Sequence, residues 1–249
     1  MSQTGEVVAE ARPPEDGGVA WVELLRWSTI AGIVVIALIN LFAGVIPPLI
    51  VFGLLMIGGL AWLQRATKGP AILLLVVAIA HVALSAPFTF PSFAVPASAG
   101  DFILNLAGLL AGIVAIVAAV AVLRGSMGVS STPRAIGRTA VAVFAVGAAF
   151  SIFSTVTYDS ATAQEGDIRL VAQDIEFSED SLDASGGQIS VFVENKDQTL
   201  HTFTIDELDV SLDIPASKSA RVTFDAEPGE YEFFCQPHKE DMKGTIKID

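Results

Sequence analysis

The chain has 249 residues, of which 52% are hydrophobic and only 16% are charged, and its mean hydropathy is +0.60. This composition is too apolar for a soluble globular protein and indicates a membrane protein. The net charge of -13, with no basic patch and no Walker-type phosphate loop, argues against a nucleic-acid-binding or nucleotide-binding protein.

The excess negative charge lies in the last third of the chain. Residues 1–163 contain seven acidic and seven basic side chains, whereas residues 164–249 contain twenty acidic and seven basic ones. The chain therefore divides into a neutral apolar part and an acidic polar part. Two interpretations of the acidity stay open: it steers a basic partner toward the protein, or it keeps the acidic part soluble, for example in high salt.

The apolar part predicts a multi-span helical membrane domain at residues 19–158, after a polar tail at 1–18 that we expect to be disordered. No charged side chain occurs from Trp27 to Leu63, a run that would be roughly 55 Å long as one helix. Pro47 and Pro48 divide this run in its middle. We therefore expect about five transmembrane helices, the second of them short enough to be re-entrant instead, at residues 25–46, 48–63, 70–86, 102–123 and 138–158.

Positive charges predict the orientation of these spans. Lysines and arginines precede the first span, separate the second from the third, and separate the fourth from the fifth. The connections at 44–48 and 87–100 have none, and the second of these contains phenylalanines among prolines, which favours a loop at the headgroup level. The amino terminus is therefore expected in the cytoplasm, and the residues after 158 on the extracellular or periplasmic side.

Two features of the membrane part have competing interpretations. His81 is its only histidine, and we expect a packing residue rather than a metal ligand or proton carrier. Arg134 and Arg138, followed by an apolar stretch and a small-residue segment ending at Ala163, are typical of a signal peptide cleaved after Ala163. We favour an uncleaved anchor, because four spans precede this segment.

After a linker at 159–166, the pattern changes from continuous apolar helix to alternating polar and apolar residues. Gln188–Glu194 is an example of this alternation, and turn residues such as Glu227-Pro228-Gly229 separate it from similar segments. Several short strands without helices predict an all-β sandwich at residues 167–249. We expect its strands at 168–177, 188–194, 201–206, 219–225, 230–235 and 243–248.

Four side chains of this second part have the donor types of a copper site. His201 opens one predicted strand, Cys235 ends another, and His238 and Met242 follow in the next loop. Cys235 is the only cysteine, so it cannot form an internal disulfide. Two imidazoles, one thiolate and a weak axial thioether are the ligands of a blue-copper electron-transfer site. One ligand from an upstream strand and three from one loop can converge at one end of a sandwich.

Other interpretations of these residues are weaker. Each side chain alone could be structural, Met242 for example as a filler of the core, but the four together in this order make that reading improbable. Zinc is a poorer candidate because a thioether is an unusual zinc ligand, and a binuclear copper centre would need a second cysteine. We find no nucleophile–base pair and no carboxylate dyad that indicates hydrolysis, so the sequence does not predict an enzyme.

Residues 164–249 resemble the cupredoxins, the family of plastocyanin, amicyanin and azurin, in the segments Asn195–Phe203, Gly229–His238 and Met242–Gly244. The resemblance implies a Greek-key sandwich that holds one type 1 copper. It implies His201, Cys235 and His238 as strong equatorial ligands, Met242 as the weak axial ligand, and His238 as the route of electron exchange. The Cys-x2-His-x3-Met loop is one residue shorter after the histidine than that of plastocyanin and one longer than that of amicyanin, which leaves the subfamily open.

The two parts together predict a membrane-anchored blue-copper protein in contact with membrane lipid. It would carry single electrons at the outer face of the membrane, between redox proteins such as cytochromes or oxidase-like proteins. Two alternatives stay open: a copper storage or delivery protein, and a membrane interaction protein with a non-redox β-domain.

Overall fold

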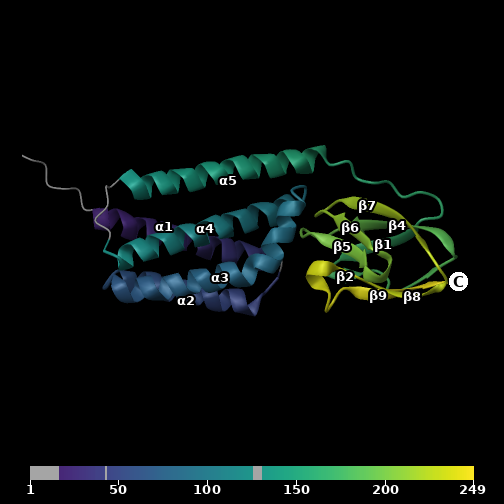
Figure 1. Cartoon of the computed structure of the whole chain (residues 1–249), viewed down its shortest axis with the longest axis horizontal. Helices are drawn as coiled ribbons and strands as arrows, with labels where there is room; N and C mark the ends of the chain where they lie inside the picture. The colour runs from purple at the N-terminus through teal and green to yellow at the C-terminus, as the bar shows by residue number, and fades with distance from the viewer. Residues whose placement is uncertain (1–16, 43, 126–130) are drawn as a thin grey trace, which may run out of the picture.

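The computed structural model describes residues 17–42, 44–125 and 131–249, so the expected disordered tail falls almost wholly outside it. Figure 1 shows an elongated molecule in which helices lie side by side along one half and all the strands are gathered in the other. The helical half comes first in the chain. The strand-rich half follows α5 in the chain and lies beyond one end of the helices.

Among the described residues the helical half consists of five helices: α1 (Gly17–Phe42), α2 (Pro47–Leu63), α3 (Lys68–Ala94), α4 (Ala99–Leu123) and α5 (Ser131–Thr157). The prediction of five apolar helices is confirmed. Four of them are long and apolar enough to cross a membrane, with mean hydropathies of 1.9 to 2.8, whereas α2 has only 17 residues. Pro47 and Pro48 occupy the first turn of α2, where the missing N–H groups need no partner inside the helix.

The prediction of a loop over 87–100 was wrong for most of its length. Helix α3 continues through Pro87 and Pro91 and ends only at Ala94. Its last turns lie against α4, where the Thr89 hydroxyl donates to Asn105 at 3.0 Å and the rings of Phe93 and Phe102 lie 5.3 Å apart. This packing outweighs the loss of two backbone donors, and the actual connection shrinks to the short α3–α4 loop, residues 95–98.

Close packing in the bundle depends on small residues of α4. A Cβ atom added at Gly112 would lie 2.5 Å from Val82 of α3, and Ala118 and Ala119 are fully buried. Helix α5 is different, because most of its apolar side chains, Val146 and Phe153 among them, are exposed. Four long apolar helices, one with an apolar outer surface, indicate association with a membrane.

The second half is a sandwich of two sheets, with strand order β2-β1-β4-β7 in one and β3-β9-β8-β5-β6 in the other. Most neighbours are antiparallel, but β1 pairs with β4 and β3 with β9 in parallel. The expected sandwich is therefore confirmed. The strands are β1 (Ile168–Gln173), β2 (Glu176–Phe177), β3 (Ser181–Ala184), β4 (Gly187–Asn195), β5 (His201–Ile205), β6 (Val210–Ile214), β7 (Ser219–Ala226), β8 (Gly229–Phe234) and β9 (Lys243–Ile248).

The structure divides or adds strands where the sequence signals are weak. The expected strand at 168–177 is broken by a turn in which Asp174 and Ile175 have φ angles of 58° and 62°, and β3 and β6 were not predicted. Two 3-10 turns, η1 (Asp206–Leu208) and η2 (Gln236–His238), also depart from the expectation of a part without helices. Elements of two to five residues are too short to show a period.

The core of the sandwich contains aromatic rings and is continuous with two of the predicted ligands. Phe203 of β5 and Phe233 of β8 are fully buried, stack with centroids 5.3 Å apart, and both make T-shaped contacts with Phe177. Cys235 and Met242 belong to the same buried cluster. Burying these rings supplies a large share of the driving force for folding, and it fixes the strand ends from which the ligands project.

An ion pair joins the start of the sandwich to the edge strand β7. Asp167, just before β1, accepts from the Arg221 guanidinium of β7 at 2.9 to 3.1 Å and from the Gln164 N–H at 2.8 Å. The hydrogen bond from Arg221 is the main reason why the pKa of Asp167 lies below its ordinary value of 3.8. The chain after α5 is therefore held against β7, where Ala161 N–H also donates to Ser219.

This ion pair predicts a pH-dependent effect of Arg221→Gln. Because the pKa of Asp167 is lowered in the folded state, the pair's contribution is complete above pH 3.8 and is lost as the pH falls through the depressed value. We expect calorimetry of the full chain to show a lower melting temperature of the sandwich at pH 7, and a difference that shrinks below pH 3.8. Lys196→Gln, which removes an exposed cation, serves as the control; a difference that is independent of pH would contradict the assignment.

Candidate metal centre

Three of the four predicted ligands lie together at one end of the sandwich. The Sγ atom of Cys235 lies 3.6 Å from Nδ1 of His201 and 3.5 Å from Nδ1 of His238, and the donor atoms of the three residues all lie within 4.8 Å of one another. The two imidazole rings are 5.0 Å apart between centroids. The structure thus brings one sulfur and two nitrogen donors to a single point.

Cys235, His238 and Met242 are held by the closed loop between β8 and β9. The register that pairs Phe234 with Lys243 continues one step further, because Cys235 N–H donates to the Met242 carbonyl at 2.8 Å. Inside the loop, the N–H of His238 donates to the Cys235 carbonyl at 3.0 Å and that of Met242 to the His238 carbonyl at 2.8 Å. These main-chain hydrogen bonds therefore keep the three residues close together.

Met242 is fully buried in the cluster that contains Cys235. Its burial and its main-chain bonds to both Cys235 and His238 are compatible with a thioether directed at the site. Its role as a weak ligand remains a prediction.

His201 reaches the site from β5, where it is fully buried. Its Nε2 lies 2.8 Å from a carboxylate oxygen of Asp197, which requires the proton to be on Nε2. The other ring nitrogen, Nδ1, then presents its lone pair toward Cys235. The carboxylate of Asp197 is itself fixed, since it accepts the backbone N–H groups of Asp174 and Ile175 at 2.8 and 3.1 Å.

The titration behaviour of these groups follows from burial. Burial lowers the pKa of His201, against the opposing effect of the hydrogen bond to Asp197 and of the negative charges of Asp197 and Asp101. Burial, and then the charge of His201, lowers the pKa of His238 to about 4. Burial also raises the pKa of the Cys235 thiol. At neutral pH both imidazoles are therefore neutral and able to ligate a cation, and a cation must displace the thiol proton.

Thr202 of β5 makes two hydrogen bonds to the segment around Cys235. Its backbone N–H donates to Cys235 Sγ at 3.3 Å, and its hydroxyl oxygen accepts the N–H of Gln236 at 2.8 Å. Donors to a sulfur ligand stabilise its thiolate form and tune a bound metal. This is a role that sequence reasoning did not assign to Thr202.

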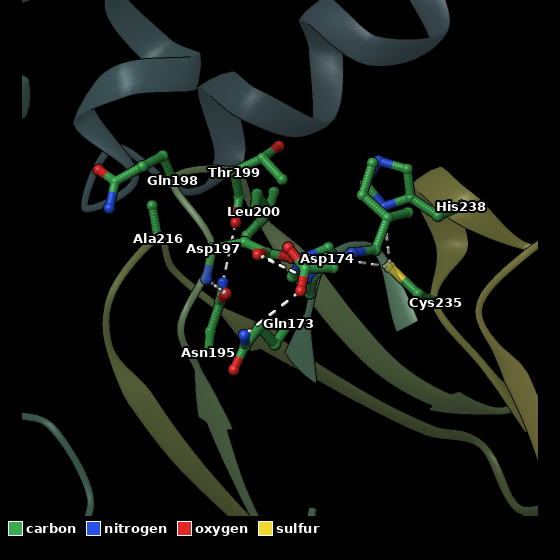
Figure 2. A network of polar contacts seen from close by, with 12 residues as sticks. Gln173, Asp174, Asn195, Asp197, Gln198, Thr199, Leu200, Ala216, Cys235 and His238 are labelled. Carbon is green, nitrogen blue, oxygen red and sulfur yellow. Dashed lines mark hydrogen bonds and ion pairs between the residues drawn. The ribbon is translucent and has the colours of Figure 1, made fainter. Parts of the chain in front are cut away.

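The residues that precede His201 form a polar network that sequence reasoning also missed. Asn195 Nδ2 lies 2.8 to 3.1 Å from the carbonyls of Thr199, Ile214 and Pro215, while its Oδ1 accepts the N–H of Asp197 at 2.9 Å. Figure 2 shows this network beside Cys235 and His238, with helix ribbons above it. The one available sequence signal was the turn-forming run Asn195-Lys196-Asp197 after the predicted strand at 188–194.

Comparison with known proteins assigns this part of the chain to a class. Residues 142–248 match the family model described as a cupredoxin-like domain, and the match begins within α5, ahead of the boundary expected at 167. The carboxyl-terminal part of the chain is therefore a cupredoxin-like domain, as the resemblance predicted. The His201–Cys235–His238 group lies within the matched segment.

The chain is also similar to several solved structures of amicyanin. A reduced variant is 17% identical over 35% of this chain and 86% of its own length, with a TM-score of 0.30. A Cu(I) form of another variant is 17% identical over 37% and 90%, with a TM-score of 0.32. Amicyanin from Paracoccus versutus is 14% identical over 35% and 85%, with a TM-score of 0.30. No curated protein matches the chain.

The polar network predicts that Asn195→Ala destabilises the domain. The substitution leaves buried carbonyls and the Asp197 N–H without partners, at a cost of about 1–3 kcal/mol. We expect the urea midpoint of the full chain, followed at pH 8 by labelling of the single thiol Cys235, to fall accordingly. Lys196→Ala, which shortens an exposed side chain in the same loop, should change the midpoint little; equal effects of the two variants would refute this role of Asn195.

Proposed function

We propose that the chain is a membrane-anchored carrier of single electrons rather than an enzyme, with one type 1 copper held by His201, Cys235, His238 and Met242. The observation that carries this proposal is the buried Cys235 Sγ with an imidazole Nδ1 on either side, at 3.6 and 3.5 Å. A buried sulfur with two neutral imidazoles is a donor set suited to copper. When bound, copper supplies a one-electron change between its cuprous and cupric states.

The protein's own contribution is a site whose shape does not depend on the oxidation state. The loop from Cys235 to Met242 is closed by main-chain bonds, and His201 is held by Asp197. Full burial of Cys235 and His201 excludes water, which would otherwise compete for the metal and respond to its charge. Ligands that barely move between the two states keep the reorganisation on electron transfer small.

His238 is proposed as the point at which electrons enter and leave. His201 is fully buried, whereas His238 is partly exposed, so of the two imidazoles only His238 can approach a partner. The next residue in the chain, Lys239, lies over the ring of Phe234, with its ammonium nitrogen 3.7 Å from the ring centroid. A short path from Cys235 Sγ through His238 to the surface is consistent with this role.

The membrane half is proposed as the anchor, with residues 19–158 in the membrane, 159–166 as linker and 167–249 as the copper domain. The four long apolar helices support this division, and the distribution of lysine and arginine supports a cytoplasmic amino terminus and an external copper domain. The ligand-bearing end of the sandwich faces the helices (Figure 1). Tethering raises the effective concentration near membrane-bound partners, and we propose cytochromes or oxidase-like proteins for this role.

Replacing the sulfur ligands tests the proposal. The full chain with one equivalent of Cu(II) should be intensely blue and bleached by reductant, and Cys235→Ser should abolish the colour. Met242→Leu should keep the colour and shift the potential, because an axial thioether tunes the site without holding it. Met56→Leu, in α2, is the matched control. A colourless wild-type chain, or a Cys235→Ser variant that remains blue, would refute the proposal.

A further inference from the structure

The first turn of α4 contacts the loop that leads into His201. One carboxylate oxygen of Asp101 accepts the N–H of Leu200 at 2.6 Å, and the other accepts the Thr199 hydroxyl at 3.1 Å. Leu200 immediately precedes His201 and is buried. A charged side chain of the membrane half thus binds the backbone next to a predicted metal ligand, about 100 residues further along the chain.

The α3–α4 loop, which precedes Asp101, is itself held by hydrogen bonds. Ser98 is fully buried, donates to Asp101 at 2.7 Å, and accepts the N–H of Ala216 from the turn before β7 at 3.3 Å. From the other side α5 holds the same α3–α4 loop, because Ser151 donates to the Pro96 carbonyl at 2.7 Å and Thr155 to the Ala97 carbonyl at 2.8 Å.

The two halves approach closely at this place. A Cβ atom added at Gly100 would lie 3.3 Å from the Gln198 carbonyl oxygen, which is tighter than ordinary contact. Figure 2 shows Gln198, Thr199 and Leu200 on the side of the polar network that faces the helix ribbons. The loop is therefore held from outside by Asp101 and from inside by Asn195, which reaches the Thr199 carbonyl at 2.8 Å.

We propose that Asp101 is a positioning residue for the metal centre: by binding Thr199 and Leu200 it holds His201 in place and docks the ligand-bearing end of the sandwich on the α3–α4 loop. The identity of His201 as a ligand rests on the proposed function, whereas the docking does not. The helical half thus sets the geometry of the site in addition to anchoring it. Hydrogen bonds to a charged acceptor are the strong kind, which suits a contact made of few groups.

Amide hydrogen exchange of the full chain tests the docking without any metal. Asp101→Ala removes both acceptor oxygens and should speed exchange across residues 198–201 by about ten-fold or more. Asp101→Asn keeps one acceptor oxygen and should give a smaller increase, which guards against a variant that merely misfolds. The control Asp225→Ala removes an exposed carboxylate from β7 and should change nothing in this segment. Unchanged exchange in Asp101→Ala would overturn the proposal.

A second pair of readouts separates positioning from docking alone. Since Cys235 Sγ contacts His201 Nδ1, displacement of His201 should alter the labelling rate of the Cys235 thiol in the metal-free chain. In the copper-loaded chain it should shift the paramagnetic-resonance spectrum of Cu(II). Faster exchange with an unaltered labelling rate and spectrum would reject the positioning role. A wild-type chain that binds no copper would refute the proposed function, yet the exchange and labelling results would still decide the role of Asp101.

Discussion

The closure of the loop between β8 and β9 is the constraint on which the site depends. Because Cys235 and Met242 are paired through the main chain and Met242 returns to His238, the spacing of three donors follows from backbone hydrogen bonds. The stacked rings of Phe203 and Phe233 hold the strands on which the loop is mounted. The fold thereby prepares a compact group of sulfur and nitrogen donors, and a bound ion needs little adjustment of the chain.

The two histidines are held at this group of donors by different contacts. This difference separates their proposed roles. His238 belongs to the loop and is partly exposed, whereas His201 is buried and depends on a chain of polar contacts outside the loop. That chain runs from His201 through Asp197 to the turn at Asp174, and from the neighbouring backbone to Asp101 of α4. In the proposed account the helical half both anchors the domain and contacts the loop before His201, which gives a physical reason for a bundle of helices in place of a single span.

The type of each residue decided how much of the fold and of the site could be predicted from the sequence. Sulfur and imidazole donors are so rare in this chain that their order alone indicated the site, and alternation in the last third indicated the sandwich. Asp101 and Asp197 carried no such signal, because they are two of 27 acidic residues and each also binds a backbone N–H of a segment distant in sequence. Helix α3 continues through Pro87 because of its packing against α4, a tertiary effect that local propensity does not contain.

X-ray absorption at the copper edge of the full chain, loaded with one equivalent of the metal, tests the central claim most directly. The account predicts one sulfur and two imidazole nitrogens as strong scatterers in both oxidation states, with nearly unchanged distances when the sample is reduced. A copper environment of oxygen donors, or one whose coordination number changes on reduction, would contradict a site prepared by the fold.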